Sequence, residues 1–180
     1  MYEGKITIRP TRREELENVR ALWNDGDVMQ YVGFPHGLDA TAESMERWYD
    51  RIASKRPLLE HYSVFAEGIG YCGESYYRID TAHENAAVLD IKLFSKARGR
   101  EIASAALQYA IEQAFVNGAA CVWVDPNPEN RKALALYRRL GFSERETSAY
   151  LKRSAVHGGV PSRYFEICSG EVPTAGFAGK

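Results

Sequence analysis

The segment spanning residues 89–107 has the composition of a phosphate-binding turn. An apolar run ending at Phe94 is followed by a short basic turn that contains a glycine, Lys96–Arg100, and an alanine-rich helical pattern begins directly after it. A strand that passes through such a turn into a helix directs several unpaired backbone N–H groups at one point, where the helix dipole adds partial positive charge. The segment therefore predicts a site for the phosphate or pyrophosphate of a cofactor.

Two acidic residues lie in segments where a charge needs an explanation. Asp90 interrupts the otherwise apolar run VLDIKLF, and Glu74 stands between Gly73 and Ser75 on the preceding segment. An unpaired buried charge is costly, so each acid either lines a cleft or belongs to an ion pair, for which Lys92 is a candidate partner of Asp90. Both interpretations are consistent with the sequence. The four histidines are assigned no role.

Hydrophobic periodicity and turn residues predict helices and strands along the whole chain. A capping box of Thr11 and Glu14 is expected to open the first helix, and residues 25–37 are expected to form a loop with apolar content. The predicted strands are 5–9, 62–67, 71–79, 87–94, 120–125, 147–152 and 163–168. The predicted helices run from 11 to 23, from 39 or 41 to Pro57, from 99 to 117, and from 130 to 140.

This order of elements predicts an α/β fold of the α+β type. Consecutive strands favour antiparallel hairpins, whereas a helix between two strands favours a parallel crossover. We therefore expect a mixed, mostly antiparallel central sheet of about seven strands, flanked by helices on both faces. Residues 1–170 form a single domain in this interpretation, and residues 171–180 form a frayed tail.

The composition is that of an ordinary globular protein. Hydrophobic residues make up 45% of the 180 residues, and 23 Lys and Arg against 24 Asp and Glu leave a net charge of -1. This balance argues against a nucleic-acid partner or an anionic membrane surface, and we expect neither a membrane span nor a signal peptide. The three cysteines, Cys72, Cys121 and Cys168, follow no pairing or zinc-binding pattern. We therefore expect reduced thiols, a cytoplasmic protein and no metal site.

Two motifs together resemble the GNAT superfamily of acyl-CoA N-acyltransferases. Arg98–Ala103 is similar to the family's pyrophosphate motif (Arg or Gln, two residues, Gly, one residue, Gly or Ala), except that Glu101 stands where the family usually has Gly. Asn130–Phe142 fills all five positions of the second pattern: Asn, two residues, Ala, three residues, Tyr, three residues, Gly-Phe. Residues 23–32 resemble the ribosomal-protein N-terminal acetyltransferase branch of this superfamily. Residues 68–76 and 125–128 resemble the aminoglycoside 6'-N-acetyltransferase branch.

The resemblance implies acetyl-CoA as the co-substrate. Backbone N–H groups of the turn would hold the pyrophosphate, and the pantetheine arm would follow the Ile91–Phe94 strand, which the family parts from strand 120–125 by a bulge. A backbone N–H near Leu93 would stabilise the oxyanion, and Asn130 would bond the pantetheine amides while also capping its helix. The implied donor-binding residues are Ile91, Leu93, Arg98, Gly99, Arg100, Glu101, Ile102, Ala103, Asn130 and Lys132. For Arg98, Arg100 and Lys132, the alternative is an exposed position in solvent without a phosphate contact.

The resemblance also implies that Tyr137 is the general acid, because a phenol carries a proton for the departing thiolate. By spacing alone, a core position beside Leu136 and Leu140 would be the favoured interpretation of Tyr137. Asp90 and Glu74 are rival candidates for orienting the acceptor and accepting its proton. Tyr31 and Phe34, in an irregular stretch, are expected to wall the acceptor pocket.

The expected function is therefore transfer of an acetyl group from acetyl-CoA to a primary amine by direct attack on the thioester. The acceptor is a small-molecule amine or a peptide N-terminus, and the protein could act as a homodimer. A non-catalytic acyl-CoA-binding module is one alternative, because the carboxylate of Glu101 would repel phosphates. An acyltransferase that uses another acyl group is a second.

Overall fold

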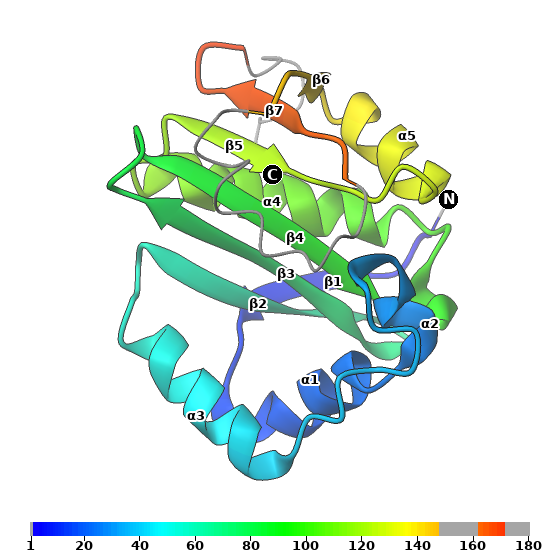
Figure 1. Cartoon of the computed structure of the whole chain (residues 1–180). Helices are drawn as coiled ribbons and strands as arrows, with labels where there is room; N and C mark the ends of the chain where they lie inside the picture. The colour runs from blue at the N-terminus through cyan, green and yellow to red at the C-terminus, as the bar shows by residue number, and fades with distance from the viewer. Residues whose placement is uncertain (1, 148–161, 172–180) are drawn as a thin grey trace.

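The computed structural model, which describes residues 2–147 and 162–171, is built on one seven-stranded sheet in the order β1-β2-β3-β4-β5-β7-β6 (Figure 1). The strands are β1 (Ile6–Pro10), β2 (Leu59–Ala66), β3 (Gly70–Asp80), β4 (Ala86–Leu93), β5 (Cys121–Val124), β6 (Ser143–Glu144) and β7 (Phe165–Cys168). Neighbouring strands are antiparallel except β4 and β5, which are parallel. The expected mixed, mostly antiparallel sheet is confirmed.

Helices cover both faces of this sheet (Figure 1). The α-helices are α1 (Leu16–Trp23), α2 (Gly26–Met29), α3 (Ala42–Ala53), α4 (Ile102–Val116) and α5 (Arg131–Arg139), and the 3-10 helices are η1 (Arg13–Glu15), η2 (Gln30–Val32) and η3 (Ser95–Ala97). On one face α4 and α5 share a core with β5, in which Leu107, Val122 and Tyr137 are buried. On the other face α1 and α3 bury Leu22 and Met45. Within the described residues, no helix combines the length and hydropathy that crossing a bilayer requires.

The predicted capping box of Thr11 and Glu14 is wrong. The hydroxyl of Thr11 lies 2.7 Å from Nδ1 of His61, and the carboxylate of Glu15 accepts a hydrogen bond from the backbone N–H of Arg12 at 2.9 Å. Thr11 cannot cap the helix because its side chain is bonded to the neighbouring strand β2 instead.

Residues 25–37 contain α2 and η2 instead of the predicted loop. The carboxylate of Asp25 accepts from the backbone N–H groups of Asp27 and Val28, and this N-cap starts the short α2 helix. At the other end of the chain, the predicted strand 147–152 lies outside the described residues except for residue 147, which is not in a strand. The predicted tail, 171–180, is described only at Glu171.

A β-bulge in β3 sets the direction of Glu74. The pairing of β2 with β3 changes register at Phe65, which leaves Cys72 as an extra residue on β3. Gly73 follows with a φ of 150°, and a Cβ at this position would lie 2.0 Å from the carbonyl oxygen of Lys92. Only glycine therefore fits there. Because the extra residue shifts the alternation of side chains, Glu74 faces α1 and α3.

Candidate active site

The turn between β4 and α4 has the backbone geometry of a phosphate site. Gly99 and Glu101 have left-handed φ angles of 74° and 63°, and α4 begins directly after them. The backbone N–H of Ala105 donates to the carbonyl of Glu101 at 3.1 Å and forms the first turn of the helix. Ile102 and Ala103 lie before Ala105 in the first turn of α4, where backbone N–H groups have no acceptor within the helix. These groups fit the cradle that the sequence predicts for a pyrophosphate.

The backbone of Glu101 explains why glycine suits this position. A left-handed conformation costs a residue that carries a Cβ about 1–2 kcal/mol, whereas glycine adopts it freely. The side chain of Glu101 is exposed to solvent. The turn therefore keeps its shape with a glutamate in it, at the cost of backbone strain.

Arg98 ties this turn to two other elements. Its Nε donates to the carbonyl of Leu93 at the end of β4 over 3.1 Å. Its two terminal nitrogens donate to Asp27 of α2, Nη1 to the carboxylate at 3.0 Å and Nη2 to the backbone carbonyl at 3.2 Å. Arg98 thus bridges β4 and α2.

The remaining predicted donor-binding side chains lie at the surface or at a helix end. Arg100 and Lys132 are exposed. Asn130 caps α5, because its Oδ1 accepts from the backbone N–H of Ala133 at 3.1 Å. The capping role predicted for Asn130 is confirmed, and its amide NH₂ is a separate donor group.

Beyond Val88, β4 has a free edge on its β5 side. It pairs with β5 only over its first three residues but with β3 as far as Leu93. The N–H of Phe94 donates to the carbonyl of Cys72 in β3 at 2.9 Å. Since backbone groups alternate along a strand, the N–H groups of Ile91 and Leu93 point to the opposite edge. That edge is where the sequence predicts the pantetheine arm and the oxyanion donor.

The bulge expected in β4 is wrong. The pairing of β3 with β4 is continuous from Ala86 to Leu93, and the register shift lies between β2 and β3 instead. The parting of β4 from β5 arises because the parallel pairing stops at Val88, not because β4 gains a residue.

Tyr137 is buried on α5, in the core against which Ile91 of β4 also packs. Its ring packs edge-to-face on Phe142 with the ring centres 5.7 Å apart. Burial raises the pKa of the Tyr137 phenol, and the negative charge of Asp90 raises it further. The phenol therefore keeps its proton at neutral pH, and the charge of Asp90 is close enough to act on it.

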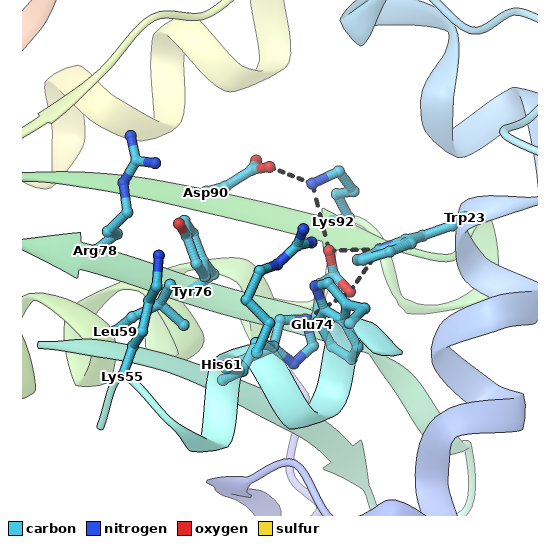
Figure 2. Close-up of a pocket in the computed structure, with 12 residues that line it drawn as sticks. Trp23, Lys55, Leu59, His61, Glu74, Tyr76, Arg78, Asp90 and Lys92 are labelled. Atoms are coloured by element: carbon cyan, nitrogen blue, oxygen red, sulfur yellow. Dashed lines mark hydrogen bonds and ion pairs between the residues drawn. The ribbon is translucent and has the colours of Figure 1, made fainter. Parts of the chain in front are cut away.

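A cavity of about 380 Å³ lies between the sheet and the helices α1 and α3 (Figure 2). Its floor follows the register of three strands: His61 on β2 is opposite Tyr76 on β3, which is opposite Asp90 on β4. Two register positions further along, on the same face, Glu74 is opposite Lys92. The lining residues are Trp23, Trp48, Arg51, Ile52, Lys55, Leu59, His61, Glu74, Tyr76, Arg78, Asp90 and Lys92.

Glu74 is the centre of a buried hydrogen-bond network (Figure 2). Its carboxylate, only 3% exposed, accepts from Nε1 of Trp23 at 2.9 and 3.0 Å, from Nε2 of His61 at 2.9 Å and from Nζ of Lys92 at 3.3 Å. Burial by itself raises the pKa of Glu74, but the interactions with His61 and Lys92 outweigh it and hold the pKa well below its usual range. A carboxylate held ionised by three donors is a poor proton acceptor.

Asp90 is the more open of the two predicted acids. Its side chain is 39% exposed, forms an ion pair with Lys92, and accepts from the backbone N–H of Ile91 at 2.7 Å. Asp90 also lines the cavity and acts electrostatically on Tyr137. The structure thus brings Asp90, Tyr137 and the free edge of β4 together.

Tyr31 and Phe34 lie apart from the lining of this cavity. They belong to η2 and the loop after it, and they are 37% and 44% exposed. The contact between Arg98 and Asp27 fastens the preceding helix α2 to the phosphate-binding turn. A role for Tyr31 and Phe34 in acceptor binding stays a prediction.

Comparison with known families decides what kind of site this is. Residues 5–143 match a family model described as the acetyltransferase (GNAT) domain. The chain belongs to the GNAT acetyltransferase family. The match covers every element that builds the site, from β1 to the start of β6.

Relatives of this GNAT protein agree with that assignment. The spermidine N(1)-acetyltransferase of Escherichia coli (strain K12) is 27% identical over 139 residues, which cover 77% of this chain and 73% of the relative. The spermidine N-acetyltransferase from Vibrio cholerae, solved with CoA and spermine, has a TM-score of 0.74 at 18% identity and covers 92% of this chain and 96% of its own. The ribosomal-protein-alanine N-acetyltransferase from Brucella melitensis has a TM-score of 0.71 at 19% identity, and the match covers 90% of this chain and 99% of the other. Both solved structures share the fold.

Sequence reasoning missed the basic part of the GNAT cavity. Lys55, His61 and Arg78 line it although none was a candidate. One signal was available: Glu74, Tyr76 and Arg78 are spaced by two, which places them on one face of a strand. The contribution of Lys55 and His61 depends on how α3 and β2 pack, which local spacing does not show.

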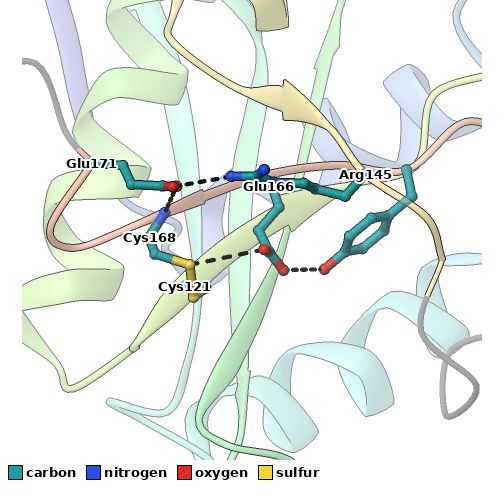
Figure 3. Close-up of a disulfide and its surroundings, with 6 residues drawn as sticks. Cys121, Arg145, Glu166, Cys168 and Glu171 are labelled. Carbon is teal, nitrogen blue, oxygen red and sulfur yellow. Dashed lines mark hydrogen bonds and ion pairs between the residues drawn. A yellow bond between two sulfur atoms is a disulfide. The ribbon is translucent and has the colours of Figure 1, made fainter.

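The expectation of three reduced cysteines is wrong. Cys121 and Cys168 form a disulfide (Figure 3). Cys72 is a buried free thiol. The two bonded residues are 47 apart in sequence but directly opposite each other on antiparallel β5 and β7. That register brings them together, and sequence spacing does not reveal it. With Glu166, these cysteines are the group of described residues close enough to hold a metal ion, but their sulfurs are bonded to each other.

Proposed function

We propose that this GNAT protein transfers the acetyl group of acetyl-CoA to the nitrogen of an amine by direct attack on the thioester. The observation that carries the proposal is that strand β4 adjoins both the proposed donor site and the cavity proposed for the acceptor. Its end at Leu93 leads into the phosphate-binding turn, and Asp90 lines the cavity. An amine beside Asp90 would face a thioester held along the free edge of the same strand. The relatives whose names specify spermidine support an amine as acceptor.

Backbone groups of the chain would hold the donor. The N–H groups of Ile102 and Ala103 would bind the pyrophosphate. At the edge of β4 the backbone carbonyl of Ile91 would accept from the pantetheine arm, since the N–H of Ile91 is bonded to Asp90 and the carbonyl of Leu93 to Arg98. The amide NH₂ of Asn130 would add a donor at the start of α5. Other residues that would shape or attract the donor are Arg98, Gly99, Arg100, Glu101 and Lys132.

Four groups of the chain would then carry the transfer. Asp90 accepts, directly or through water, the proton that the amine loses, while Glu74 keeps Lys92 and His61 in place. The N–H of Leu93 donates to the carbonyl oxygen as it gains negative charge. Tyr137 gives its proton to the sulfur as the carbon–sulfur bond breaks and the carbon–nitrogen bond forms. The products are an amide and the thiol of CoA, and solvent restores the protons.

The test combines CoA binding by calorimetry with acetyl-CoA turnover, followed by thiol release, on a panel of amines. The proposal expects saturable CoA binding, turnover of at least one amine, and a loss of about 100-fold or more in kcat for Asp90→Asn. Arg47→Gln, an exposed position on α3 outside the cavity, is the matched control.

Other outcomes would separate the alternatives. CoA binding without turnover of any amine would favour a non-catalytic acyl-CoA-binding module. Turnover with longer acyl-CoA donors only would favour a different acyl group. Absence of CoA binding would contradict both the donor site and the reaction.

A further inference from the structure

Three cations line the cavity without an ion-pair partner among the described residues: Arg51, Lys55 and Arg78. All three are exposed at the mouth of the cavity. The other charged lining residues pair with one another, since Lys92 bonds both Glu74 and Asp90. The cavity therefore holds more positive than negative charge, and its surplus is at the mouth.

The two kinds of charge are separated along the strands. Glu74 and Arg78 share a face of β3 and lie about 13 Å apart along it, at about 3.3 Å per residue. Asp90 is opposite Tyr76, midway between them but on the neighbouring strand, and is therefore about 8 Å from the position of Arg78. Figure 2 shows Arg78 and Lys55 at one end of the cavity and Glu74 at the other.

Arg51, like Arg78, acts on Tyr76, which lies midway along the cavity. Burial raises the pKa of the Tyr76 phenol, and the positive charges of Arg78 and Arg51 are among those that oppose this rise. Both guanidinium groups are therefore close to Tyr76. An anion placed beyond Tyr76 would be attracted by these cations, whereas a second ammonium would be repelled.

We propose that the acceptor of this site is an amine that also carries an anionic group, a carboxylate or a phosphate, about 8 Å from its nitrogen. The amine would lie at Asp90, and the anionic group would lie between Arg51, Lys55 and Arg78. This inference rests on the proposed function and specifies its substrate class. A linear polyamine would instead place a second ammonium among three cations.

The experiment compares acceptors that differ only in their distal group. The ω-amino acids from 3-aminopropanoate to 6-aminohexanoate are matched with diamines and n-alkylamines of equal chain length, and 3-aminopropyl phosphate tests a phosphate. Calorimetry with each acceptor on the CoA-bound protein supplies a readout that does not need turnover. We expect kcat/KM for the best ω-amino acid to exceed that of the diamine of equal length by about 10-fold or more, because three cations act on the anion.

Variants at the cationic end test the origin of this preference. Arg78→Gln is expected to reduce the preference for the ω-amino acid several-fold through KM, and Arg78→Glu is expected to invert it. Arg47→Gln, on α3 and outside the cavity, should leave the preference unchanged. CoA binding establishes that each variant is folded.

Each result decides a different point. Equal or better use of diamines would overturn the inference and leave the acetyltransferase proposal intact. Binding of ω-amino acids without turnover would support the ligand class and count against the enzyme. If neither series binds or reacts while CoA binds, the inference is wrong and the non-catalytic alternative gains.

Discussion

Arg98, in the turn before α4, and Asp27 of α2 form an ion pair, with Nη1 donating to Oδ2 over 3.0 Å. Asp27 belongs to α2, which leads directly into the segment that carries Tyr31. Arg98 also bonds the carbonyl of Leu93 at the end of β4. The segment after α2 is thus fastened to the strand along which the donor is proposed to lie.

Asp27→Asn is expected to loosen this connection without unfolding the protein. We expect the KM of the acceptor to rise about three- to ten-fold while CoA affinity changes by less than about two-fold, because the donor cradle is made of backbone groups. Stability should hardly change, since exposed ion pairs contribute about 0–1 kcal/mol. Glu17→Gln, which breaks the exposed pair with Arg20 on α1, is the control. An unchanged acceptor KM would count against the connection.

Glu101→Gly is expected to stabilise the protein by about 1 kcal/mol and to tighten CoA binding. The substitution relieves the left-handed backbone and removes a carboxylate from the proposed phosphate site. Urea unfolding and CoA calorimetry measure the two effects.

Two further variants separate these causes. Glu101→Ala removes the charge and keeps the strain, so it should improve CoA binding without raising stability. Glu84→Gly relieves a similar φ of 55° in the loop before β4 and should raise stability without changing CoA affinity. Weaker CoA binding in Glu101→Gly would indicate that the carboxylate itself contributes to the site.

Tyr137→Phe is expected to lower kcat by about 100-fold or more and to leave CoA affinity and folding nearly unchanged. The ring keeps its packing against Phe142, and only the proton donor is lost. Because burial and Asp90 raise the phenol pKa, loss of its proton should not limit the wild-type rate below about pH 10. Tyr109→Phe, in a separate aromatic pair with Tyr62, is the matched control. A small effect on kcat would assign Tyr137 to the core alone.

Glu74→Gln is expected to destabilise the fold by about 3 kcal/mol at pH 7, because Lys92 would lose the buried one of its two carboxylate partners. The pKa of Glu74 is lowered in the folded state, so its stabilising contribution is complete above the unfolded value of about 4.3 and is lost as the pH falls further. The free energy of unfolding, measured with urea between pH 3 and 7, should therefore fall less steeply at acidic pH in the variant than in the wild type. Glu46→Gln, which removes the charge from an exposed pair with Arg13, should leave the acidic pH dependence of the unfolding free energy unchanged.

The disulfide between Cys121 and Cys168 predicts a stability that depends on reductant. Loss of a crosslink across 47 residues is expected to cost about 4 kcal/mol through the entropy of the unfolded chain. Dithiothreitol should lower the melting temperature of the wild type and have no effect on Cys168→Ser. Unfolded without reductant, the protein should titrate as one thiol, that of Cys72. Three thiols would contradict the disulfide.

The parts of the site that sequence anticipated are those that local pattern encodes. The turn around Arg98–Ala103 and the cap at Asn130 depend on neighbouring residues, and both are where the pattern placed them. Two of the wrong expectations involve partners far apart in the chain. Thr11 bonds His61 across two strands, and Cys121 meets Cys168 through the pairing of β5 with β7.

Sequence by itself determined the element order, the mixed sheet, the position of the turn before α4 and the family pattern, since these follow from periodicity, capping and motif spacing. Tertiary structure alone decided which acids and bases share the cavity. The bulge at Cys72 turns Glu74 toward α1, and strand register then sets it opposite Lys92 and sets Asp90 opposite Tyr76. The physical reason is that one residue of register moves a side chain to the other face of a sheet, and this register is fixed by packing across the whole sheet.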